Sequence, residues 1–256
     1  MTPHPDWLLP DWQAPGVGAL MTTRHGGVST GAFASMNLRH AVGDDAPAVQ
    51  RNRQILERAA GVLPIYLNQV HGARVVRLGA ADADARAPVH QADACVSTAF
   101  GIACTAQVAD CLPVLFAAPG AVGAAHAGWR GLAAGVLEAA LHAVCEAAAC
   151  APAEVQVWLG ACIGPRRFEV GADVLQAFKA TAAADAGPSE RPGFAPQPNG
   201  KWLADLPQLA RGRLAARGVT RIGGGHWCTV DDVSRFFSFR RDGVTGRMVA
   251  AVWRVG

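Results

Sequence analysis

Four short apolar segments follow one another closely along the middle of the chain. They cover residues 92–97, 102–108, 113–118 and 121–126, and glycine, proline or polar residues separate them. Short apolar runs bounded by such residues are typical of buried β-strands. Many consecutive strands, followed by an Ala- and Leu-rich helical segment, predict a mixed α+β fold in which helices cover a partly antiparallel sheet.

Hydrophobic periodicity predicts the remaining elements. Further strands are expected at residues 16–23, 63–67, 73–78, 154–160, 221–228 and 247–254, and helices at residues 43–61, 130–149, 171–181 and 203–217. In the first of these helices, Val49, Ile55, Leu56 and Ala59 form an apolar face, and Gly61 is a helix stop. The acidic start of the same helix suits the helix dipole.

The chain contains no internal repeat and no clear linker, so residues 1–256 are predicted to form a single catalytic domain. Residues 1–15 are expected to be an N-terminal extension. Residues 182–200 cluster proline, glycine, serine and charge, which predicts a surface loop within the domain rather than a boundary.

The composition is typical of a globular protein and does not indicate binding to nucleic acid or insertion into a membrane. Hydrophobic residues make up 51% of the chain and charged residues 17%, and the net charge is only +3 with scattered basic residues, so no nucleic-acid groove is expected. No apolar stretch approaches the ~20 residues of a membrane span, and the N-terminus lacks the features of a signal peptide. The seven cysteines are dispersed without a CxxC pair, which favours a reducing cytoplasm over a disulfide framework.

Three residues with metal-binding or catalytic side chains lie at predicted strand ends. His71 lies in "NQVHG", Cys111 lies between two predicted strands, and His126 ends a strand just before "GWRG". Strand ends can converge at one rim of a sheet. One cysteine and two histidines suit zinc and leave a fourth position for water or substrate. Asp110 beside Cys111 could orient a ligand or handle a proton.

Each of these residues also has a purely structural interpretation. A lone histidine or cysteine in an apolar protein is usually a packing residue. That role is expected for the cysteines inside apolar runs, which are Cys95, Cys104, Cys145 and Cys150. The three candidates differ from these because they lie in polar, glycine-bounded contexts at strand ends, although their spacing matches no compact metal motif.

Two glycine-rich basic segments are candidates for binding a substrate or an anion. In "HAGWRG", Gly128 and Gly131 flank Trp129 and Arg130 at a predicted helix start, where free backbone N–H groups and the guanidinium can hold phosphate. The alternative is that the glycines allow a tight turn and that Trp129 packs. In "TTRHGGVSTG", Arg24 can reach a substrate.

The combination of motifs resembles one known family. "TTRHGGVSTGAFASMNL", "NQVHG", "ADCLPVL", "HAGWRG", "IGPRRFEVG" and "FFSFRRDGVTGRM" follow in that order. They resemble the family labelled multicopper polyphenol oxidoreductase (laccase-like), whose bacterial members are also called peptidoglycan editing factor or purine nucleoside phosphorylase. The likeness extends from about residue 17 to residue 254.

The resemblance implies a one-domain layered α/β sandwich of mixed sheet and helices, with one catalytic pocket. It implies a zinc ion held by His71, Cys111 and His126, which also makes these three, with Asp110, the catalytic candidates. The implied substrate contacts are Arg24, Arg130, Asn37 and Gln69. One departure follows "IGP", where many family members have a cysteine pair and this chain has Arg166 and Arg167.

The activity implied by the resemblance is phosphorolysis of adenosine, inosine, guanosine and methylthioadenosine, together with deamination of adenosine. Deamination suits an open zinc site, with Asp110 or Glu169 to transfer protons. Phosphorolysis requires that phosphate be held against the anomeric carbon, a role that Arg24 and Arg130 fit. The expected partners are therefore a purine nucleoside and phosphate.

Three other functions stay open. A multicopper oxidase needs many histidines, commonly in His-x-His pairs, whereas this chain has eight histidines and no such pair, so at most a single copper is expected. Cys111 as a thiolate with a histidine base, or the zinc site itself, would make an amidase that edits cytoplasmic peptidoglycan precursors. A non-catalytic zinc protein would need a fourth ligand, for which Cys162 and Cys228 are the spare candidates.

Overall fold

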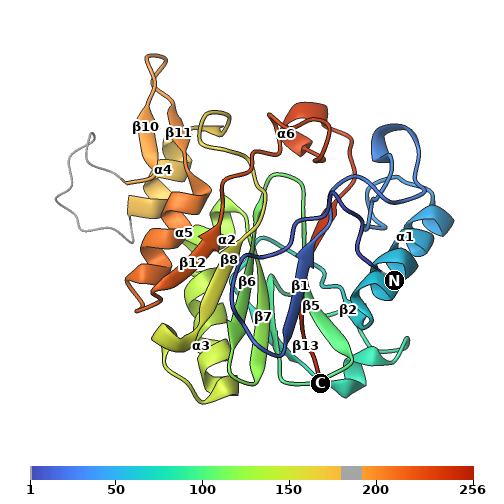
Figure 1. Ribbon diagram of the computed structural model, residues 1–256. Coiled ribbons are helices and arrows are strands. Elements are labelled where there is room, and N and C mark those ends of the chain that lie inside the picture. Colours follow the sequence, from blue (N-terminus) through green and yellow to red (C-terminus); the bar gives the residue numbers. More distant parts are fainter. Residues whose placement is uncertain (1, 180–191) are drawn as a thin grey trace.

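The central strands are buried along their whole length. Every residue is buried in β5 (Ile102–Val108), β6 (Leu112–Ala118) and β7 (Ala121–Ala127). A sheet with two apolar faces must pack against a layer on each side. The computed structural model describes residues 2–179 and 192–256, and it has four layers: two sheets face to face, with helices on the outer side of each (Figure 1).

The other strands of the described chain are β1 (Val17–Met21), β2 (Leu63–Ile65), β3 (Val75–Leu78), β4 (Ala94–Ser97), β8 (Gln156–Leu159), β9 (Glu169–Val170), β10 (Phe194–Pro196), β11 (Trp202–Ala204), β12 (Arg221–Gly224) and β13 (Met248–Arg254). Its α-helices are α1 (Ala46–Ala60), α2 (Trp129–Ala133), α3 (Val136–Ala148), α4 (Ala172–Lys179), α5 (Leu206–Ala215) and α6 (Phe239–Asp242). Short 3₁₀ helices cover Gly31–Phe33, Ala80–Ala83 and Pro152–Glu154.

The two large sheets are both mixed. One has the strand order β12-β8-β6-β7-β4-β3, and the other has the order β1-β13-β5-β2. The neighbours β8/β6, β6/β7 and β7/β4 are antiparallel, whereas β12/β8 and β4/β3 are parallel. A small third sheet has the order β10-β11-β9. The predicted mixed fold, a layered sandwich of mixed sheet and helices, is confirmed.

Successive side chains of a strand point to opposite faces of its sheet, and the described chain has three apolar clusters. Between the sheets, Leu115 and Trp158 of the six-stranded sheet pack in one cluster with Cys104 and Val252 of the four-stranded sheet. On the outer face of the six-stranded sheet, the neighbouring Val114 points the other way, as the two-residue period of a strand requires.

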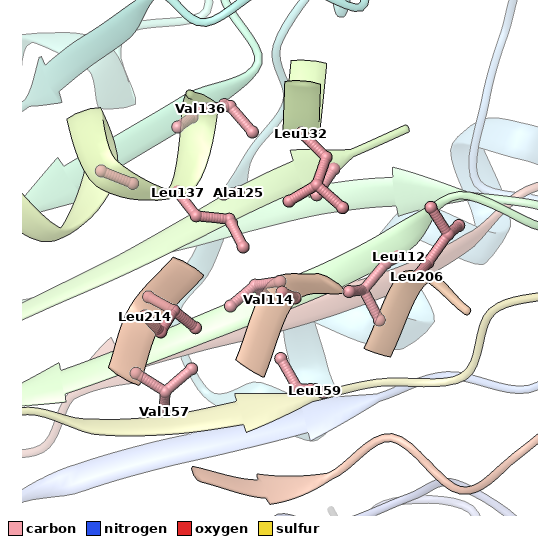
Figure 2. Close-up of a cluster of buried hydrophobic side chains, with 14 of the residues drawn as sticks. Leu112, Val114, Ala125, Leu132, Val136, Leu137, Val157, Leu159, Leu206 and Leu214 are labelled. Carbon is pink, nitrogen blue, oxygen red and sulfur yellow. The ribbon is translucent and has the colours of Figure 1, made fainter. Parts of the chain in front are cut away.

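Helices cover the outer face of each sheet. Figure 2 shows Val114 and Val157 of the six-stranded sheet in one cluster with Leu137 of α3 and Leu214 of α5. On the other side of the molecule, Leu56 of α1 packs against the four-stranded sheet. The apolar face predicted for the first helix is therefore the face that packs.

Two predicted helices have different bounds in the structure. The segment 130–149 is divided into α2 and α3 because Gly135 adopts φ +91°, a left-handed conformation that ends one helix before the next begins. The segment 203–217 begins instead as strand β11, and α5 starts after Asp205, whose carboxylate accepts the backbone N–H of Gln208 at 2.9 Å.

The N-terminal extension lies against the body, since Trp7 is only 5% exposed and Leu8 forms a bridge with Met21. Of the predicted surface loop 182–200, the part up to residue 191 lies outside the described residues, and Phe194–Pro196 forms β10. Strands β9 to β11 and helix α6, which have between two and four residues each, were not predicted as such. Among the described residues, no helix combines the length and apolarity that crossing a membrane requires.

Candidate metal centre

Four strand ends of the six-stranded sheet meet at one rim. β6 starts where its antiparallel neighbour β7 ends, so Pro113 pairs with His126, and Cys111 stands just before this pair. β4 starts beside the end of β7, and β3 starts beside β4, which brings the β2–β3 loop with His71 to the same rim. The three residues singled out from the sequence therefore lie together.

The donor atoms of the three side chains form a compact group. The Sγ of Cys111 lies 3.9 Å from the Nε2 of His71, and all three donor atoms lie within 4.8 Å of one another. His126 is only 3% exposed, Cys111 is half-buried and His71 is exposed, so the group opens to solvent on the His71 side. His71 adopts φ +62° and Asp110 adopts φ +93°, a conformation that is uncommon outside glycine and often marks functional sites.

Asp93, just before β4, organises the group, and no sequence argument identified it. Its Oδ1 accepts hydrogen bonds from His126 Nδ1 and from the backbone N–H of His71, both at 2.9 Å. Its Oδ2 accepts the backbone N–H groups of Val70 at 3.2 Å and Gly72 at 2.7 Å. One buried carboxylate thus fixes the His71 loop and directs the Nε2 of His126 away from itself. The available signal was an acidic residue directly before a buried strand.

The electrostatics favour a charged Cys111–His126 pair in the protein alone. Burial opposes ionisation of the Cys111 thiol, but His126 and His71 outweigh it and lower its pKa to about 6. Burial also opposes protonation of His126, but Cys111 and Asp93 outweigh it and raise the pKa of His126 to about 9. At neutral pH the two groups therefore form a thiolate and an imidazolium.

The glycines of "HAGWRG" permit close packing at the site. A Cβ on Gly128 would lie 3.0 Å from both the Cys111 Sγ and the His71 Cδ2, and a Cβ on Gly131 would lie 2.8 Å from the Gly72 carbonyl oxygen. Helix α2 has only 5 residues, and Trp129 packs against the outer core. The geometry therefore favours the structural alternative, in which the glycines let the backbone pack closely and Trp129 packs, over an anion site.

The two acids considered for proton transfer are both engaged elsewhere. Asp110 accepts the hydroxyl of Thr229 and the backbone N–H of Arg240, each at 2.6 Å, so it ties α6 to the rim. Glu169 forms a salt bridge of 2.6 Å with Lys201 at the small sheet. Their catalytic roles stay predictions.

The predicted substrate contacts also have structural partners. Arg24 donates to the carbonyls of Ala34 and Val233, both at 3.0 Å, and Gln69 exchanges two hydrogen bonds of 2.8 Å with the backbone of Gln107. Asn37 is fully buried.

Arg130 is exposed and stacks on Trp129, with 4.2 Å from its guanidinium carbon to the ring centroid. Cys162 and Cys228 are free thiols whose backbones form an isolated parallel β-bridge, and neither belongs to the group formed by His71, Cys111 and His126. Within the described residues that group is the only cluster with metal-binding geometry, which leaves a multicopper centre without ligands.

Known proteins resemble the whole chain. A profile of the family described as multi-copper polyphenol oxidoreductase laccase matches residues 18–255. A purine nucleoside phosphorylase from Pseudomonas aeruginosa is 49% identical over 251 residues, which cover 96% of this chain and 98% of the relative. The purine nucleoside phosphorylase YfiH from Escherichia coli is 44% identical over 255 residues, with 97% and 98% covered.

Solved structures extend the likeness to three dimensions. A crystal structure of a Neisseria meningitidis protein matches with a TM-score of 0.87 at 44% identity, covering 98% of this chain and 100% of that one. The crystal structure of YlmD from Geobacillus stearothermophilus matches with a TM-score of 0.89 at 32% identity, covering 100% and 98%. The similarity therefore concerns the entire fold and not a fragment.

Proposed function

The chain belongs to the multi-copper polyphenol oxidoreductase laccase family, and from this premise we propose that it is a zinc-dependent purine nucleoside phosphorylase. The observation that carries the proposal is the solvent-open group of His71, Cys111 and His126, in a chain that is 49% identical to a purine nucleoside phosphorylase. The proposed substrates are adenosine, inosine, guanosine and methylthioadenosine.

The donor set fits a zinc ion. In a tetrahedral zinc site, a sulfur and a nitrogen ligand lie about 3.6 Å apart, given typical Zn–S and Zn–N bonds. The 3.9 Å between the Cys111 Sγ and the His71 Nε2 is close to this value. Asp93 occupies the Nδ1 of His126, which leaves its Nε2 for the metal. Copper binds the same donors, and metal analysis distinguishes the two ions.

Zinc with three protein ligands supplies an open coordination position, Lewis acidity and a lowered pKa of bound water, towards ~7. The chain itself supplies orientation. Asp93 fixes the His126 tautomer and the His71 loop, and burial of His126 keeps water from that side. Asp110 holds α6 beside the centre, and we propose that it or Glu169 handles a proton during adenosine deamination.

A specific observation also favours a second candidate function. The pKa of Cys111 is lowered to about 6 beside a His126 whose pKa is raised to about 9, which is the state that a cysteine nucleophile and its histidine partner require. The second candidate is therefore an amidase that edits cytoplasmic peptidoglycan precursors, with Cys111 as its nucleophile.

The test is to purify the protein without a metal-affinity tag, measure its bound metal, and assay base release from adenosine and inosine with and without phosphate. We expect about one zinc per chain and phosphate-dependent base release, at least about 100-fold lower in His71→Ala, because a residue of the reacting centre is removed. His142→Ala is the matched control, since His142 is exposed on α3 and forms an ion pair with Glu146 on the same helix. Zinc-loaded protein that cleaves no nucleoside would contradict the proposal. Base release that survives chelation but is lost in Cys111→Ala would make Cys111 a nucleophile and not a zinc ligand.

A further inference from the structure

Two arginines, Arg39 and Arg247, are held side by side by one buried amide. The Oδ1 of Asn37 accepts the backbone N–H of Arg39 at 3.1 Å and that of Arg247 at 2.9 Å. The Nδ2 of Asn37 donates to the carbonyl of Arg39 at 3.1 Å and to Asp44 at 2.9 Å. Since Asn37 is fully buried and both of its polar atoms form hydrogen bonds, it fixes the backbone positions of Arg39 and Arg247.

The sheet places this pair beside the metal centre. Arg247 directly precedes β13, whose first residue pairs with Val108, the last residue of β5. Cys111 follows in the turn between β5 and β6, so Arg247 and Cys111 leave neighbouring strands at the same rim. This rim lies at the end of the sheets away from the C-terminus, which follows β13 (Figure 1).

The charges of Arg39 and of residues at the centre act on Arg247. Burial and the charge of Arg39 lower the pKa of Arg247, while the negative charges of Cys111 and Asp110 act in the opposite direction. These effects require that Arg39, Cys111 and Asp110 lie within electrostatic reach of Arg247, which agrees with their places in the sheet.

Neither arginine has a carboxylate partner in the part of the chain that the structure describes. Arg247 uses its Nη1 for the carbonyls of Thr245 at 2.8 Å and Gly246 at 3.0 Å, and its guanidinium carbon lies 5.6 Å from the Phe239 ring centroid. Among the described residues, its Nη2 and the guanidinium of Arg39 form no hydrogen bond. Both guanidinium groups are half-buried, they repel each other, and neither is neutralised by a carboxylate. Such a pair suits the binding of an anion.

We propose that Arg39 and Arg247 bind the inorganic phosphate that attacks the nucleoside, beside the centre formed by His71, Cys111 and His126. The inference rests on the proposed phosphorylase function. An oxygen of hydrogen phosphate forms a bond to the anomeric carbon while the bond from that carbon to the purine nitrogen breaks. The purine nitrogen keeps the bonding electron pair and takes up the phosphate proton, which gives a sugar 1-phosphate and the free base.

The assignment differs from the prediction that Arg24 and Arg130 hold phosphate. The Nε and Nη1 of Arg24 donate hydrogen bonds to backbone carbonyls, and Arg130 is exposed and stacks on the Trp129 ring. Arg39 and Arg247 combine unused donors with a place beside Cys111. A guanidinium with unused N–H groups can bind phosphate at two oxygens. Arg130 also has unused donors, but it is exposed, whereas Arg39 and Arg247 are half-buried.

The test measures base release from inosine against phosphate concentration in the zinc-loaded protein. In Arg39→Gln and Arg247→Gln, we expect the KM for phosphate to rise about tenfold or more, as loss of a charge-assisted hydrogen bond implies, and the KM for inosine to change by less than about twofold. Arg39→Gln keeps the backbone hydrogen bonds to Asn37, so it should fold normally. Arg86→Gln is the control, because Arg86 is 90% exposed and pairs with Asp84.

Binding of inorganic phosphate alone, followed by calorimetry, separates this inference from the proposed function. Phosphate binding that is present in the wild type and lost in both variants supports the site, even if no nucleoside is cleaved and the proposed function fails. Phosphorolysis with an unchanged phosphate KM in both variants overturns the site and leaves the function intact. An increase in phosphate KM confined to Arg24→Gln or Arg130→Gln also overturns it.

Discussion

At the residue scale, Cys111 is the side chain of the rim whose pKa is lowered most usefully for a test, to about 6. In the metal-free protein we expect its alkylation by iodoacetamide to follow a midpoint near its pKa of about 6, because burial is outweighed by His126 and His71. The thiolate is the reactive form, so the rate falls as pH drops below that midpoint and is level above it. Mass spectrometry of the peptide that contains Cys111 measures the rate, and bound zinc should protect the sulfur.

Cys145 is the internal control for this measurement. It is also half-buried, but burial and the neighbouring Cys150 raise its pKa to about 11, so it should react only at high pH. A Cys111 midpoint near 9, the ordinary value for a thiol, would contradict the thiolate–imidazolium pair.

At this scale the sequence supported part of the site. His71, Cys111 and His126 were recognisable because each lies in a polar context next to an apolar strand. Asp93 was not, because its role consists of hydrogen bonds to the His71 loop and to the end of β7, and these segments meet only in the folded chain.

At the element scale, the start of β4 acts as the support of the β2–β3 loop. Asp93→Asn removes the charge that accepts one ring N–H and three backbone N–H groups, and the new amide N–H₂ cannot accept a hydrogen bond. We expect zinc affinity to fall about 10- to 100-fold, the usual effect of losing a carboxylate that orients a histidine ligand. Competition with a chromogenic chelator measures this affinity.

Asp82→Asn is the matched control for that variant. Asp82 also pairs with a histidine, His90, at 2.6 Å, and also accepts a backbone N–H, from Gly79 at 2.8 Å. It lies in a 3₁₀ helix and contacts none of the three proposed ligands, so zinc affinity should stay at the wild-type value. Equal losses of affinity in both variants would mean that Asp93 acts through general stability and not through ligand orientation.

The bounds of elements were less predictable than their existence. Helical periodicity continues through "RGLAAGVLEAALHAVCEAAA", yet Gly135 divides the segment into two helices. The short α2 packs against the His71 loop, where a Cβ on Gly131 would lie 2.8 Å from the Gly72 carbonyl oxygen. Strand β11 overlaps the first residues of the helix predicted at 203–217, and α5 begins only at Leu206.

At the scale of the whole molecule, the four layers explain why the site lies where it does. Both faces of the central strands are occupied by cores, so the rims are where their polar groups can reach solvent. The layered arrangement was predictable because it follows from apolar segments. The approach of residues 37–39 and 247 to the rim that carries His71 and Cys111 was not, because it depends on strand order, which no local pattern encodes.

The metal should therefore stabilise the whole fold, because it joins segments that are distant in sequence. Zinc that binds only the folded chain adds about 2.7 kcal/mol to the free energy of unfolding when free zinc is about a hundredfold above the dissociation constant. For a protein of this size, that corresponds to an increase in Tm of about 5–10 °C. Differential scanning calorimetry of metal-free protein titrated with zinc measures the increase, and His71→Ala should abolish it while His142→Ala keeps it. An identical zinc response in wild type and His71→Ala would place the metal elsewhere in the chain.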